Sequence, residues 1–177
     1  MNYFQVKTLV AKLTKKLDLE DIFVIPPVPY PFSFTTHYFG RCVLFIRKVW
    51  KSEKESVRDI VLHEIGHVHF FTYHGGSVMK KKEFREVFGN PNKAWPKTSW
   101  KGDLFETFGL TDWQDSYQDD PRYISKYAQT HPWEDYAETF VRAWHEVEGG
   151  KEKHFANPEL RKKVKTVKRW IRETMVD

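Results

Sequence analysis

Apolar residues recur at helical spacing in several stretches of the chain, beginning near its N-terminus. Between residues 3 and 18, apolar side chains stand three and four positions apart among lysines, which predicts an amphipathic helix. Residues 22–35 contain four prolines, which forbid a helix and remove ladder hydrogen bonds, so we expect an extended, irregular segment. Residues 41–50 are rich in β-branched and aromatic side chains and predict a strand. One small mixed sheet is the expected result.

The longest helical pattern follows that strand. Ser52 and Glu55 form a capping box before it and a glycine pair ends it, which predicts a helix of about 22 residues from Glu53 to His74. Three further helices are predicted. They cover residues 79–88, residues from Pro132 to about Gly149, and residues from Asn157 onward. Residues 91–125, between the first two of these helices, are predicted to form an aromatic-rich loop region.

Length and composition limit the class of fold. At 177 residues the chain is long enough for one buried core and too short for two comfortable domains, so we expect a single domain over residues 1–177. Cys42 is the only cysteine, which excludes an internal disulfide. No secretory signal or run of about 18 apolar residues is visible, and we expect a soluble, cytoplasmic protein of α+β class, mostly helical.

The chain is basic, with a net charge of +5 that is concentrated in the last predicted helix. A basic surface can bind an acidic partner such as nucleic acid, but a run of this kind is more often a solvated helical face. The run consists of Arg161, Lys162, Lys163, Lys165, Lys168, Arg169 and Arg172.

Candidate chemistry lies in the sequence VLHEIGHVHF of the longest predicted helix. His63 and His67 stand four residues apart, so both imidazoles project from one face and can reach one ion. A catalytic zinc ion uses three protein ligands and leaves one position to water. Glu64 can take a proton from that water, so the motif predicts a zinc site with a general base.

The third ligand must come from elsewhere in the chain. Glu134 and Glu138 stand four residues apart in a helical pattern among apolar side chains, where carboxylates are expensive to bury without a partner. We expect Glu134 to bind the metal and Glu138 to hold a ligand histidine in its tautomer, with a solvated pair as the alternative. Other candidates for the third ligand are His131, His145 and His154.

These residues and Tyr127, seven positions before Glu134, resemble the pattern of anthrax lethal factor and its relatives, including the clostridial proline-proline endopeptidases. The resemblance covers about two dozen residues in two islands, and Asp135 and Tyr136 replace the usual pair of phenylalanines. It implies a zincin architecture with the sheet packed on the metal-binding helix. It assigns zinc binding to His63, His67 and Glu134, the base to Glu64, oxyanion stabilisation to Tyr127 and a supporting contact to Glu138. Without the resemblance, one tyrosine among the eight of this chain is more often a packing residue.

Other polar residues receive ordinary interpretations. His69 and His74 are expected to face solvent or cap the helix, and Asp112, Asp115, Asp119 and Asp120 lack the spacing of an EF-hand. The sequence therefore predicts a zinc-dependent endopeptidase acting on a protein or peptide. The resemblance to zincins further implies that the strand at residues 41–50 is a sheet edge, which an extended substrate can join as an extra strand. The alternatives are an intracellular regulatory or DNA-associated protease and a non-catalytic zinc-binding interaction domain, against which Glu64 argues.

Overall fold

The computed structural model describes residues 3–19, 22–28, 34–38, 41–47, 57–74, 78–89 and 120–176. Its elements, in chain order, are α1 (Tyr3–Lys16), β1 (Ile22–Val28), β2 (Phe34–Tyr38), β3 (Arg41–Arg47), α2 (Val57–His74), α3 (Val78–Phe88), the short 3₁₀ helix η1 (Tyr127–Gln129), α7 (Pro132–Val147) and α8 (Pro158–Thr174). Over these described residues, the prediction of a mostly helical chain with a small sheet is confirmed.

The sequence predicts one small mixed sheet, and the three described strands form such a sheet in the order β1-β3-β2. β1 runs parallel to β3, and β2 runs antiparallel to it. Val24 of β1 lies opposite Leu44 of β3, and both side chains are buried. The expectation of a sheet edge at residues 41–50 is wrong for the described residues 41–47, because β3 is the central strand and both of its sides are paired.

The proline-rich segment is more regular than we expected. β1 includes Pro26 and Pro27, and its register with β3 shifts between Ile25 and Val28. A proline cannot donate to a ladder, so prolines are tolerated on an edge strand at such an irregularity.

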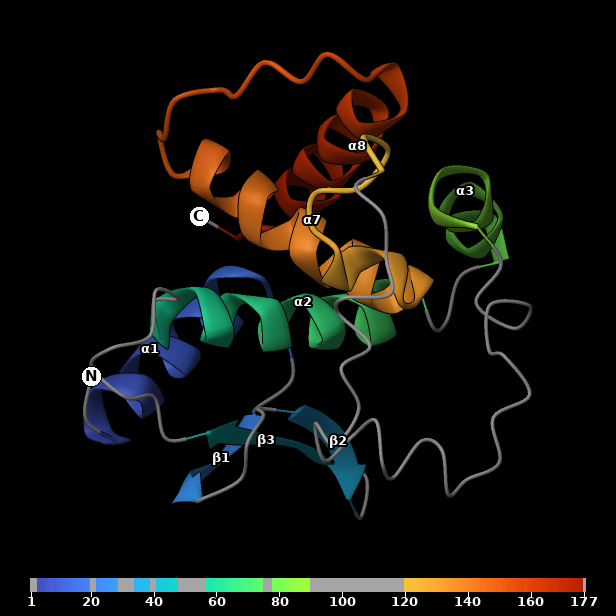
Figure 1. Ribbon diagram of the computed structural model, residues 1–177. Helices are drawn as coiled ribbons and strands as arrows, with labels where there is room; N and C mark the ends of the chain where they lie inside the picture. The colour runs from blue at the N-terminus through green and yellow to red at the C-terminus, as the bar shows by residue number, and fades with distance from the viewer. Residues whose placement is uncertain are drawn as a thin grey trace.

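The elements lie in layers, with α2 between the sheet and α7, and with α8 packed on the far side of α7 (Figure 1). α1 lies beside α2 at the edge of the sheet, and the backbone N–H of Val176 donates to the carbonyl of Lys16 at 3.0 Å. α2 is therefore covered on two sides, and apolar side chains of α2, α7 and α8 pack together in the core. They include Val61, Leu62 and Ile65 of α2, Phe140 and Trp144 of α7, and Trp170 and Ile171 of α8.

The predicted helix boundaries largely hold. α7 begins at Pro132, and Asn157 caps α8 by accepting hydrogen bonds from the backbone N–H groups of Glu159 and Leu160 at 2.8 and 3.2 Å. α2 ends at His74 as predicted, whereas residues 51–56 with the expected capping box, and residues 90–119 of the expected loop, lie outside the described residues. No helix in the described ranges is long and apolar enough to cross a membrane.

The basic run of α8 is only partly a solvated face. Arg161, Lys162 and Lys165 are exposed as expected, but Lys163 is 6% exposed and Lys168 is half-buried. Each of these two lysines pairs with a carboxylate of α7, so part of the basic charge serves to join the two helices.

Candidate metal centre

Three side-chain atoms converge between α2 and α7. His63 Nε2 lies 3.1 Å from Glu134 Oε2 and 3.2 Å from His67 Nε2, and His67 Nε2 lies 3.3 Å from the same Glu134 oxygen. Within the described part of the chain, this is the group of histidine and carboxylate side chains that could hold a metal ion.

The dimensions of this triangle fit zinc. An ion bound tetrahedrally at about 2.0–2.1 Å from each ligand holds any two ligand atoms about 3.3–3.4 Å apart. The three observed sides differ from that value by no more than about 0.3 Å. Two imidazoles and one carboxylate are also the ligand types of many catalytic zinc sites.

The two helices place these groups by simple means. His63 and His67 share one face of α2 because they are one helical turn apart. Glu134 lies in the first turn of α7, after His131, whose ring accepts a hydrogen bond from the backbone N–H of Trp133 at 3.1 Å. This cap fixes the start of α7, and with it the position of Glu134.

Gly66 allows the two helices to approach closely. A Cβ atom at this position would lie 3.1 Å from the Cα atom of Ala137 and 3.2 Å from the Cβ atom of Phe140. Both contacts are tighter than ordinary van der Waals contact, so a side chain here would push α7 away. We did not single out Gly66 from the sequence, although a glycine inside a helix, directly before a ligand histidine, was the available signal.

Glu138 contacts the outer nitrogen of His63. Its Oε1 atom lies 2.9 Å from His63 Nδ1, so a proton on Nδ1 is donated to the carboxylate, and Nε2 is the nitrogen that would give up its proton to a metal ion. Burial by itself lowers the pKa of His63, but hydrogen bonds to Glu134 and Glu138 outweigh it and hold the pKa well above 6.5. Glu134 and Glu138 therefore contact opposite nitrogens of one ring.

Glu134 is held in its ionised form. Burial by itself raises the pKa of this carboxyl, but the attraction of His67 and hydrogen bonds from both histidines bring the pKa well below its usual range. A carboxylate must be ionised to bind a metal, so this environment suits a ligand.

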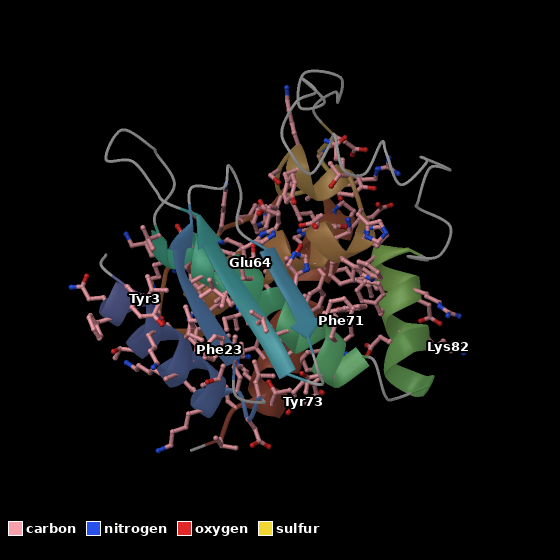
Figure 2. The ribbon with its side chains drawn as sticks, turned by 90° about the horizontal axis from the view of Figure 1, so that it is seen from below. Tyr3, Phe23, Glu64, Phe71, Tyr73 and Lys82 are labelled. Carbon is pink, nitrogen blue, oxygen red and sulfur yellow. The ribbon has the colours of Figure 1, made fainter. Side chains whose placement is uncertain are left out.

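Glu64 and Tyr127 lie near the three candidate metal ligands, and the charge of Glu64 acts on both His63 and Tyr127. The Glu64 side chain is 4% exposed, and Figure 2 shows it on α2, seen through the sheet. The ring of Tyr127 is centred 5.7 Å from the ring of His63. Desolvation of the phenol and the charges of Glu134 and Glu64 raise the pKa of Tyr127 well above 10, so its hydroxyl keeps its proton and can donate.

The three alternative histidines do not join the metal group. His131 caps α7, the Nε2 atom of His145 lies 2.7 Å from Asp59 Oδ1, and His154 is exposed. Of the four loop aspartates, only Asp120 is described, and hydrogen bonds from Arg122 lower its pKa to about 2.

The expectation for His69 is wrong, because its side chain is completely buried. Thr174 Oγ1 donates to the carbonyl of Ile171 at 2.8 Å, so it accepts from His69 Nε2 at 3.0 Å. His69 Nδ1 then accepts from the hydroxyl of Tyr136 at 2.7 Å. The imidazole thereby connects α2, α7 and α8, which the sequence of α2 alone does not reveal. The side chain of His74 lies outside the described residues.

Comparison with known families agrees with this geometry. A family model described as "Putative zinc-binding metallo-peptidase" matches residues 48–171, which is more than half of the chain. The chain belongs to this family. Zinc is thus the cofactor that both the family and the ligand atoms of this member support. Neither the curated proteins nor the solved structures gave a match.

Proposed function

We propose that this family member is a zinc-dependent endopeptidase with a zincin-like fold, and that it cleaves a peptide bond in a protein or peptide. The observation that carries the proposal is the triangle of His63, His67 and Glu134, with Glu64 and Tyr127 beside it. A purely structural zinc site closes its fourth position with another protein ligand and has no need of a base.

Zinc held by these three side chains would supply a Lewis acid that polarises the scissile carbonyl and acidifies a water molecule. Glu64 takes a proton from the water as it attacks and returns the proton to the leaving amine. Because Glu64 is 4% exposed, little bulk water competes for that proton.

Tyr127 donates its hydroxyl proton to the carbonyl oxygen as negative charge develops there. The raised pKa supports this role, because a phenol that stays protonated remains a donor. Glu138 keeps His63 in the tautomer that binds the metal. Together with the spacing of Tyr127, Glu134 and Glu138, these contacts support a site arranged as in the lethal factor group.

The substrate would bind along β2, Phe34–Tyr38. Among the described strands, β1 and β2 each pair with β3 on one side only; the metal-site helix α2 packs against β2, whereas α1 packs against β1. An edge strand offers backbone N–H and C=O groups that an extended peptide can pair with. β2, and not the strand at residues 41–50, is thus the proposed substrate-binding edge.

The experiment is a peptide library incubated with the zinc-loaded protein and analysed by mass spectrometry. We expect cleavage that a zinc chelator abolishes and added zinc restores. His67→Ala should lose both zinc and cleavage, whereas His145→Ala, which removes a histidine paired with Asp59 outside the metal group, should keep both. A protein that binds zinc but cleaves no peptide would support the non-catalytic alternative and overturn the proposal.

A further inference from the structure

Lys163 of α8 has an unusual environment for a lysine. Its side chain is 7% exposed, and its ammonium donates to Asp135 Oδ2 at 2.6 Å and to the backbone carbonyl of Arg122 at 3.0 Å. The same ammonium lies 4.1 Å from the centre of the Tyr123 ring, within the range of a cation–π contact. Its proton donors are thus directed at two different segments of the chain.

Those two segments carry functional side chains. Asp135 directly follows Glu134 in α7, and its side chain leaves the helix toward α8 while that of Glu134 meets the two histidines. Arg122 and Tyr123 lie at the start of the stretch that leads to Tyr127, the first residue of η1. One ammonium therefore ties the start of α7 to the stretch that presents Tyr127.

Stability alone gives a poor account of this buried pair. Taking two charges out of water costs several kcal/mol per ion, and apolar side chains of similar volume often replace such a pair without loss of stability. The cost is reflected in Asp135, whose burial raises the pKa to about 6 in spite of the attraction of Lys163. What an apolar pair could not supply is the hydrogen bond to the Arg122 carbonyl, which has a defined length and direction.

We propose that Lys163 is a positioning residue that fixes Tyr127 relative to Glu134 by holding the Arg122 carbonyl and the Asp135 carboxylate on one ammonium. The inference rests on the proposed function for its catalytic consequence, but the geometric part can be tested without activity. Lys163 itself contacts neither substrate nor metal in this account.

The test compares two double variants of the same pair of helices. Asp135→Asn with Lys163→Met removes both charges, so no buried charge is left unpaired. The control, Glu146→Gln with Lys168→Met, removes the 3.0 Å ion pair that joins α7 to α8 near the other end of α7. A general loosening of the two helices would affect both variants alike.

The first measurement is hydrogen exchange in the zinc-loaded proteins. The amides of Gln129 and Thr130 donate to the carbonyls of Lys126 and Tyr127 at 3.1 and 3.0 Å. We expect both amides to exchange at least about 10-fold faster in the Asp135→Asn, Lys163→Met variant than in the wild type. In the control variant, their exchange rates should change less than about 2-fold. Equal changes in the two variants, or no change in either, would overturn the inference.

The second measurement is a double-mutant cycle with Tyr127→Phe. In the wild-type background, this substitution should lower kcat about 10²- to 10³-fold, the usual loss for one oxyanion donor. In the Asp135→Asn, Lys163→Met variant, kcat should already be reduced with little change in KM. Adding Tyr127→Phe to that variant should lower kcat by less than about a further 10-fold. Full additivity of the two losses would overturn the inference.

The two proposals fail in different ways. If Tyr127→Phe leaves wild-type kcat unchanged, the role of Tyr127 is rejected, and hydrogen exchange alone decides whether Lys163 positions this stretch.

If the double variant does not fold, Lys163→Arg takes its place, because it keeps the charge but cannot place a single compact ammonium among the three partners. Unchanged exchange and unchanged kcat in Lys163→Arg would overturn the inference.

Discussion

At the scale of single residues, neighbouring contacts distinguish side chains of the same type. Glu134 and Glu138 are both glutamates of α7, one turn apart and similarly exposed. Only Glu134 reaches both histidine Nε2 atoms, whereas Glu138 meets the opposite nitrogen of His63. Sequence spacing alone could not distinguish the two roles, because both carboxylates share one helical face.

This difference predicts unequal effects on zinc binding. Glu134→Ala removes one of three ligands and should abolish stable zinc binding, whereas Glu138→Ala should weaken zinc affinity by about 10- to 100-fold. Competition with a chromophoric chelator measures both affinities. Glu173→Ala, on the exposed face of α8, serves as the control and should bind zinc like the wild type. A stronger loss in Glu138→Ala than in Glu134→Ala would exchange the two roles.

At the scale of elements, the distance between α2 and α7 controls the site. The ligand triangle needs one side chain from α7 to reach two from α2, and Gly66 is where the backbones come close enough. The sequence motif supplies the two histidines, but this second requirement depends on how α7 crosses α2. Periodicity within either helix does not encode that crossing.

Gly66→Ala should therefore disturb metal binding. Alanine favours a helix over glycine by about 1 kcal/mol, but its methyl group would press on the backbone of Ala137, and overpacking of this kind costs about 1–3 kcal/mol. We expect a small net loss of stability together with weaker zinc binding. Thermal unfolding and zinc competition on the same preparation check both effects. A more stable variant with unchanged zinc affinity would show that the close approach is not needed.

Elements with strong local signals were the ones that the sequence predicted well. Pro132 at the first turn of α7 and Asn157 at the cap of α8 act on their own backbone, so the boundaries follow from nearby residues. β2 was not predicted as a separate strand, because its five residues, FTTHY, directly follow the proline-rich stretch and carry no run of apolar side chains, although they pair antiparallel with the adjacent β3. Because β2 was not predicted, the sequence did not indicate that β3 is the central strand.

At the scale of the whole molecule, polar contacts between distant helices fix the arrangement around the site. His69 connects α2 to Tyr136 of α7 and Thr174 of α8, and Lys163 connects α8 to Asp135. No local pattern indicates that His69 or Lys163 is buried, because histidines and lysines in amphipathic helices are usually exposed. Their partners lie from 28 to 105 residues away, and only the folded arrangement identifies them.

The central claim is that Glu64 acts as the base of a zinc peptidase. The most direct test measures zinc content and peptide cleavage for wild type and Glu64→Gln from parallel preparations. We expect about one zinc per chain in both proteins. The glutamine keeps the shape of the side chain but cannot accept the proton, so cleavage should be nearly abolished in the variant alone. Full cleavage by Glu64→Gln with zinc bound would contradict the account.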